Sequence, residues 1–143
     1  MGRIRNFEAL ATNGLRRDAL QIAEAGYKAI NTGEVVRSKV QVANDELRIV
    51  DKIYDIAGRN VYFVGVGKCA FAAAGAFEKM LGDKLTGGVA LDVSATDKDG
   101  IKKIETYIGT HPLPTEANEK ATERIVEFLS GRNESDLVIF FFF

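Results

Sequence analysis

Apolar and small residues recur at helical spacing near the start of the chain, at Leu15, Ala19, Ile22, Ala23, Gly26 and Ile30. This period predicts an amphipathic helix, and Asn13 just upstream is a suitable N-cap. A short helical turn is expected between Thr32 and Lys39. Beyond it, alternating apolar and polar positions predict a β-hairpin around Asn44-Asp45, with apolar members Val40, Val42, Leu47 and Ile49.

A sharper pattern follows, in which a strand signal changes directly into a helix signal. The apolar, β-rich run Val61–Val64 ends in Gly65-Val66-Gly67. Helical spacing then resumes at Ala70, Phe71, Ala74, Phe77 and Leu81. The segment is typical of a strand, a glycine turn and a helix.

The rest of the chain supplies three more strand signals and one helix signal. Gly87-Gly88 precede a second strand, Val89–Val93, which the polar loop Ser94–Gly100 separates from a third strand at Ile104–Ile108. A last apolar run, Leu137–Phe143, predicts a fourth strand.

The predicted helix of this half lies between the third and fourth strands. Thr110–Pro114 must be extended, because a proline disfavours helix in the residue before it. Thr115 can cap the helix that follows, whose buried side is marked by Ala117, Ala121, Ile125 and Leu129. Gly131 and Asn133 end it.

Apolar strands that alternate with helices favour an α/β fold with a Rossmann-like parallel sheet and helices on both faces. The N-terminal helical segment is expected to pack on this sheet. Residues 1–143 form one predicted domain, since there is neither an internal repeat nor an obvious linker. The loops that follow the strands then share one edge of the sheet, where ligands of such folds usually bind.

Composition limits the classes of function. With 46% hydrophobic and 27% charged residues and a formal charge of −1, the chain is that of a globular domain without the basic surface expected of a nucleic-acid binder. Its one cysteine, Cys69, cannot form an internal disulfide, and the N-terminus lacks the apolar stretch of a secretory signal. The longest apolar run is too short to span a bilayer. We therefore expect a cytoplasmic protein without a membrane partner.

The first candidate for chemistry is Gly65-Val66-Gly67-Lys68, at the strand-to-helix junction. Glycines let a phosphate approach the backbone, a helix N-terminus offers N–H groups, and Lys68 adds a positive charge. It is not a Walker A loop, because Tyr62 replaces its first glycine and Cys69 its Ser/Thr. The turn also matches a dinucleotide-binding fingerprint weakly, with Asp83 and Asp92 as the candidate acidic residues for binding the ribose. A tight turn with a solvated lysine and no ligand remains an alternative.

The other candidates are single residues. His111, the one histidine, lies in a stiff loop after a strand, where it could contact substrate or serve a local hydrogen bond. Asp92, Asp97 and Asp99 could hold magnesium, but their loop is rich in turn residues and we assign no metal ligand. Cys69 is interpreted as a small packing residue rather than a reactive thiol.

Two stretches carry a family resemblance: Val61–Ala70, and Gly109–Asn118 followed by Ser135–Phe140. Their order and spacing resemble the N-terminal region of the MOFRL-associated (DUF4147-type) glycerate 2-kinases. The segment around His111-Pro112 is the more specific of the two motifs. In that family a glycine- and serine-rich turn follows the last of these strands, so the resemblance implies that the chain is the N-terminal part of a larger kinase.

The resemblance implies transfer of the ATP γ-phosphate to the 2-hydroxyl of D-glycerate, assisted by Mg²⁺. Lys68 would be the catalytic cation that neutralises the transferring phosphoryl group, with Gly65, Gly67 and His111 binding phosphate or substrate. Residues 1–143 alone are expected to be inactive, because much of the site would lie elsewhere in the enzyme. An exposed apolar last strand would favour self-association into a homo-oligomer.

Two alternatives remain open at this point. A phosphosugar-binding or isomerase domain of the sugar-isomerase (SIS) type would explain Gly65–Lys68 equally well, but not Thr110–Asn118. An NAD(P)-dependent hydroxypyruvate reductase would use Gly65, Gly67 and Ala70, although the lysine in the turn counts against it.

Overall fold

A four-stranded parallel sheet forms the centre of the molecule. The structure is a computed structural model that describes residues 2–143. The sheet has the order β6-β5-β4-β7, and every neighbouring pair is parallel. Its strands are β4 (Asn60–Val66), β5 (Leu85–Asp92), β6 (Ile104–Ile108) and β7 (Asp136–Phe142). The α/β fold and the parallel sheet predicted from the sequence are confirmed.

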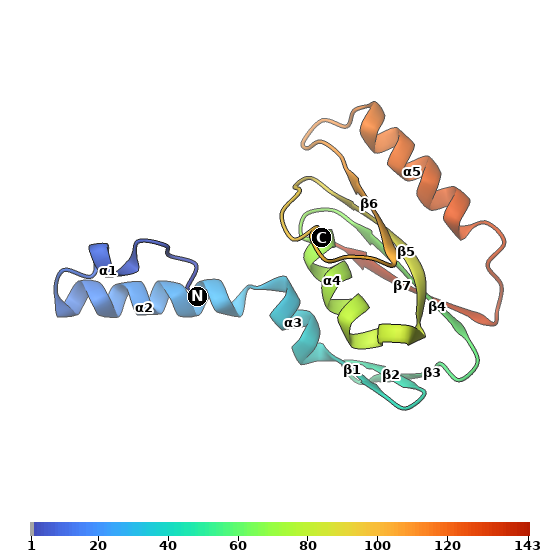
Figure 1. Ribbon diagram of the computed structural model, residues 1–143, viewed down its shortest axis with the longest axis horizontal. Coiled ribbons are helices and arrows are strands. Elements are labelled where there is room, and N and C mark those ends of the chain that lie inside the picture. Colours follow the sequence, from blue (N-terminus) through green and yellow to red (C-terminus); the bar gives the residue numbers. More distant parts are fainter. Residues whose placement is uncertain (1) are drawn as a thin grey trace.

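One long helix covers each face of this sheet (Figure 1). Consecutive residues of a strand point to opposite faces, so Phe63 of β4 packs in the core beneath α4 (Ala70–Leu81), whereas Val64 packs with α5 (Glu116–Leu129). The Phe63 and Phe77 rings lie 5.2 Å apart between the sheet and α4. The helices expected on both faces are thus present.

A second, smaller sheet extends the core on the α4 side. It is an antiparallel meander of β1 (Val40–Ala43), β2 (Glu46–Ile49) and β3 (Lys52–Asp55). Helix α3 (Thr32–Lys39) leads into it, and Val36 and Leu47 are buried in the same cluster as the apolar side of α4. The sequence predicted the hairpin β1-β2 but not the third strand.

The two N-terminal helices lie apart from the sheet. Helix α2 (Gly14–Ala29) begins as predicted at Asn13, whose side chain accepts a hydrogen bond from the Arg16 N–H, and α1 (Phe7–Leu10) packs beside it. Figure 1 shows α2 extending away from the sheet. The expected packing of the N-terminal segment is made by α3, whereas α2 has no buried residue and its Leu15 is 83% exposed.

Strand β5 begins earlier than the sequence suggested. A short 3₁₀ turn, η1 (Gly82–Lys84), leads straight into Leu85, so that Gly87 and Gly88 lie inside the strand. A Cβ on Gly88 would lie 2.5 Å from the Phe63 carbonyl oxygen. This glycine therefore serves close packing of β4 against β5 rather than a turn. In residues 2–143 no helix has the length and apolar character needed to cross a membrane.

The topology identifies one edge of the sheet as the place for a ligand. The chain moves from β4 through α4 to β5 and β6, and then returns over α5 to β7 on the other side of β4. The direction of winding therefore reverses between β4 and β7. In open α/β sheets, ligands bind at the carboxyl ends of the strands beside such a switch point.

Candidate functional site

The glycine turn lies at the carboxyl end of β4, and both of its glycines are required by close contacts. A Cβ on Gly65 would lie 2.8 Å from the Phe63 ring. Gly67 has φ +113°, and a Cβ there would lie 2.1 Å from the carbonyl oxygen of Phe143. The space that a Gly67 side chain would need is thus taken by the backbone of Phe143, just after β7, which the sequence could not reveal.

Asp92 connects this turn to the neighbouring strands. It is the one buried charged residue in the described part of the chain, with an exposure of 4%. Its Oδ2 accepts a hydrogen bond from the Phe71 N–H at 3.1 Å, in the first turn of α4. Its Oδ1 accepts from the N–H groups of Val93, at 2.7 Å, and Ser94, at 3.1 Å. The backbone carbonyl of Asp92 accepts from Gly109 after β6. Asp92 therefore fixes three loops at this edge.

These contacts change two expectations for the turn. The N-terminus of α4 was expected to offer free N–H groups to a phosphate, yet the Phe71 N–H is taken by the chain's own carboxylate. Asp92 also ends the strand after the glycine turn, where a dinucleotide-binding domain has its ribose ligand. Because its two oxygens accept backbone hydrogen bonds, they are not available to a ribose, which counts against the reductase alternative.

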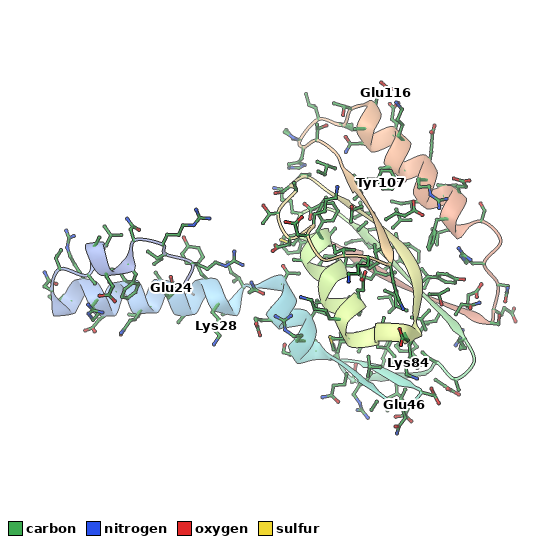
Figure 2. All side chains as sticks on the ribbon, in the orientation of Figure 1. Glu24, Lys28, Glu46, Lys84, Tyr107 and Glu116 are labelled. Carbon is green, nitrogen blue, oxygen red and sulfur yellow. The ribbon has the colours of Figure 1, made fainter. Side chains whose placement is uncertain are left out.

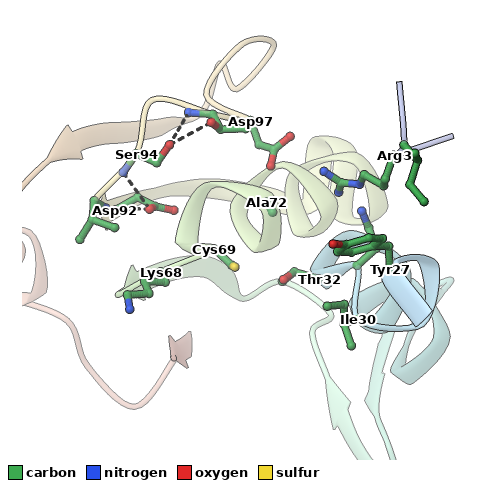
Figure 3. A pocket seen from close by; sticks show the side chains of 14 residues that line it. Arg3, Tyr27, Ile30, Thr32, Lys68, Cys69, Ala72, Asp92, Ser94 and Asp97 are labelled. Atoms are coloured by element: carbon green, nitrogen blue, oxygen red, sulfur yellow. Dashed lines mark hydrogen bonds between the residues drawn. The ribbon is translucent and has the colours of Figure 1, made fainter. Parts of the chain in front are cut away.

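A cavity of about 640 Å³ opens beside the turn (Figure 3). Lys68, Cys69 and Ala72 line one part of it. The β5 loop forms a second wall, and the end of α2 with the N-terminal segment forms a third; these walls include Arg3, Ile4, Tyr27, Thr32, Asp92 and Asp97. The Asp92–Gly100 loop, which sequence reasoning left out of the site, thus contributes to the same cavity as Lys68.

Two cationic side chains, Lys68 and Arg3, line this cavity together with the carboxylates of Asp92 and Asp97. Neither Lys68 nor Arg3 forms a salt bridge with any residue between 2 and 143. Lys68 and Cys69 are exposed, and Cys69 adopts the left-handed conformation, with φ +66°, where α4 begins. An uncommitted lysine in an open cavity is suited to binding an anion.

His111 lies on the same edge of the sheet but not in this cavity. Its loop follows β6, which β5 separates from β4, so the strands that carry His111 and Lys68 are about 10 Å apart. Asn118 holds the loop: its Oδ1 accepts from the N–H groups of Thr110 and Thr115, both at 3.0 Å. The exposed His111 is therefore presented by a braced loop, and its contact with substrate stays a prediction.

The acidic residues of the β5 loop do not assemble a metal centre by themselves. Within residues 2–143, no group of three or more His, Cys, Asp or Glu side chains is placed to hold a metal ion. The acidic residues of the described chain therefore do not form a metal cage of three or more protein ligands.

A glycine turn, a lysine without a salt bridge in residues 2–143 and an open cavity at the carboxyl ends of β4 and β5 lie where parallel α/β sheets usually bind their ligands. Residues 18–142 match the family model described as "Domain of unknown function (DUF4147)". The chain belongs to this family, as the resemblance implied.

Two curated relatives are glycerate 2-kinases. The D-glycerate 2-kinase of Thermotoga maritima is 29% identical over 107 residues, which cover 75% of this chain and 26% of that protein. The glycerate 2-kinase of Pyrococcus horikoshii is 27% identical over 124 residues, covering 87% of this chain and 27% of that protein. The chain thus spans about a quarter of the length of these relatives.

Solved structures show the same fold. A protein from Pyrococcus horikoshii OT3 superposes with a TM-score of 0.75 at 26% identity, over 90% of this chain and 29% of that one. The glycerate kinase of Thermotoga maritima gives a TM-score of 0.66 at 26% identity, over 85% of this chain and 26% of that one. This chain is therefore related to the N-terminal region of glycerate 2-kinases.

Proposed function

We propose that this chain is the N-terminal part of a glycerate 2-kinase that transfers the γ-phosphate of ATP to the 2-hydroxyl of D-glycerate. The observation that carries the proposal is Lys68, a cation without a salt bridge in residues 2–143, which follows a glycine turn and lines a cavity at the carboxyl ends of β4 and β5. The names of the curated relatives supply the substrate and the reaction.

In this proposal the residues of the chain position and neutralise charge. Phosphoryl transfer depends mainly on positioning and on stabilising the negative charge of the transferring group. Lys68 supplies the cation, Gly65 and Gly67 shape the turn that presents it, and Asp92 holds that turn against β5. Mg²⁺ would accompany the nucleotide; because the described residues offer no cluster for it, no step of the proposal passes through the metal.

The kinase is favoured over the two alternatives for separate reasons. The relatives favour it over a sugar-isomerase-type module, and the committed oxygens of Asp92 disfavour a dinucleotide site. The region matched in the relatives is about a quarter of their length, so the proposal includes a second part of the site in the remainder of the enzyme. Purified residues 1–143 should then turn over no ATP with D-glycerate.

The proposal is tested by product analysis with a protein of the relatives' length that contains this chain. Incubation with ATP and D-glycerate should give ADP and 2-phosphoglycerate, which ³¹P NMR distinguishes from 3-phosphoglycerate. Formation of a different phosphorylated product, or of none, would contradict the assignment. Turnover by residues 1–143 alone would show that the site needs nothing further.

A further inference from the structure

Helix α2 and its C-terminal cap residue carry an apolar stripe that the sheet does not cover. The stripe consists of the six residues whose helical spacing predicted this helix: Leu15, Ala19, Ile22, Ala23, Gly26 and Ile30. All six are exposed; Leu15 is 83% exposed, and Ile22 and Ile30 are each 74% exposed. Such a stripe normally faces a protein core, and most helical stability comes from packing it. The pattern of α2 therefore calls for a partner other than the sheet.

The N-terminal segment does not supply this partner, because it packs on the opposite side of α2. Glu24, labelled in Figure 2, accepts hydrogen bonds from the N–H groups of Arg3, at 3.0 Å, and Ile4. Arg17 forms an ion pair with Glu8 at 2.7 Å. With 3.6 residues per turn, Arg17 and Glu24 lie about 160° around the helix axis from the centre of the stripe. One side of α2 is thus occupied, and the stripe remains open.

The arrangement of large and small residues in the stripe is symmetric about the midpoint between positions 22 and 23. Two copies of α2 packed antiparallel on this midpoint bring together residues that lie equally far from it; these pairs are Leu15 with Ile30, Ala19 with Gly26, and Ile22 with Ala23. Large side chains then meet at the two ends, and small residues meet between them. At the centre a large side chain lies against a small one. Small residues at the contact let the two helix axes approach closely.

We propose that α2 forms an interface between two copies of this chain, packed antiparallel about a two-fold axis between Ile22 and Ala23. A two-fold contact requires a surface that is complementary to itself, and the symmetric stripe provides one. An unrelated partner would not require this symmetry. The contact also keeps like charges apart, because Arg16 and Asp18 beside the stripe lie about 20 Å and about 14 Å along the axis from their equivalents.

The position of α2 leaves room for this pairing. Figure 1 shows α2 extending away from the sheet, so a second helix can lie along it with the two sheets at opposite ends of the pair. Tyr27 and Ile30 also line the cavity beside Lys68, so the first turn of the second copy's α2 lies at the α2 wall of that cavity. The interface goes beyond the proposed function, because it forms without substrate.

Analytical ultracentrifugation of purified residues 1–143 tests the association. The mass should rise with concentration from 15.6 kDa towards twice that value. Ile22→Glu, which places a charge beside the two-fold axis, should keep the mass at 15.6 kDa. Two controls at exposed apolar positions, Val126→Glu on α5 and Phe142→Glu on the edge strand β7, should leave the dimer intact. Far-UV circular dichroism verifies that each variant is folded.

Disulfide cross-linking tests the register, in a Cys69→Ser background that removes the one native thiol. Ala23→Cys lies beside the axis and should form a covalent dimer on oxidation with diamide, whereas Ala25→Cys, exposed but off the stripe, should not. Leu15→Cys and Ile30→Cys should each give no covalent dimer alone, because their equivalents lie about 22 Å apart along the axis. A mixture of these two variants should cross-link.

The outcomes separate this interface from other occupants of the stripe. A mass of 15.6 kDa at every concentration would overturn the proposal, and the stripe would then be covered by another part of a longer protein. A dimer that survives Ile22→Glu but is lost in Phe142→Glu would place the contact at β7 instead. A covalent dimer of Leu15→Cys alone would rule out the antiparallel register. The proposed phosphoryl transfer is tested separately, by its product.

Discussion

Replacement of Asp92 by alanine should cost more stability than removal of any other acidic side chain in the described part of the chain. The change deletes one carboxylate and leaves the N–H groups of Phe71, Val93 and Ser94 without their acceptor. Asp92 is 4% exposed and Phe71 is buried, so water reaches the Phe71 N–H poorly, whereas Val93 and Ser94 are exposed. The loss combines missing hydrogen bonds with one buried, unsatisfied donor.

The magnitude follows from these three contacts. A hydrogen bond to a charged group contributes about 1.5–3 kcal/mol net. The three bonds share one carboxylate, and the Val93–Ser94 turn can partly rehydrate, so we expect a loss of about 3–5 kcal/mol for Asp92→Ala. Asp92→Asn should lower the free energy of unfolding by about 2 kcal/mol, because the amide NH₂ of asparagine is a donor and would face a backbone N–H donor on one side.

Urea unfolding followed by far-UV circular dichroism measures both changes. Asp99→Ala, in the same loop but exposed and without a hydrogen bond in the described residues, is the control and should stay within about 0.5 kcal/mol of the unmodified chain. A loss below about 1 kcal/mol for Asp92→Ala would refute the idea that this carboxylate holds the site's loops together.

Three further variants and conditions test other contacts. Gly67→Ala should lower the free energy of unfolding by more than about 2 kcal/mol, because its Cβ would lie 2.1 Å from the Phe143 carbonyl oxygen. The control Gly58→Ala, where φ is +65° and the surrounding space is open, should lower it by about 1 kcal/mol. Equal melting temperatures of the two variants would contradict this. Arg132→Ala should lower the free energy of unfolding in urea by about 1–2 kcal/mol, because the Arg132 guanidinium lies 3.9 Å from the Tyr62 ring centroid and donates a hydrogen bond to the Tyr62 hydroxyl at 3.0 Å. Arg132→Lys should restore little of this stability. The pKa of Glu24 is lowered from 4.5, so its contribution is complete above that pH and is lost as the pH falls through the lowered pKa. The protection factors of the Arg3 and Ile4 amides, each taken relative to the intrinsic exchange rate at the same pH, should fall there, and unchanged protection factors would rule out the contact.

The sequence predicted the elements whose burial follows a simple period. Helix α5 buries Ala121 and Ile125, which are four residues apart and therefore lie on the side that faces the sheet. Strand β4 is apolar over most of its length because both of its faces are covered. Strand β3 was missed because it is four residues long, with Ile53 half exposed, and so shows no clear alternation.

The candidate site was harder to predict because its walls come from distant parts of the chain. Lys68 was found because it follows a strand and two glycines. Arg3 carried no signal, since only the return of the N-terminal segment along α2 brings it to the cavity. The sequence did indicate Asp92, because it is an acidic residue at the carboxyl end of an apolar strand. Only the structure reveals that its carboxylate oxygens accept hydrogen bonds from backbone N–H groups.

The most direct test of the central claim compares Lys68→Ala with Lys52→Ala, a control in the distant small sheet, in a protein of the relatives' length that contains this chain. The account predicts that Lys68→Ala lowers kcat for phosphoryl transfer from ATP to D-glycerate by 100-fold or more, on the order of the loss of one transition-state charge contact, with an unchanged melting temperature. Lys52→Ala should keep the unmodified kcat. An unmodified kcat in a stably folded Lys68→Ala variant would remove this lysine, and the glycine turn that carries it, from the mechanism.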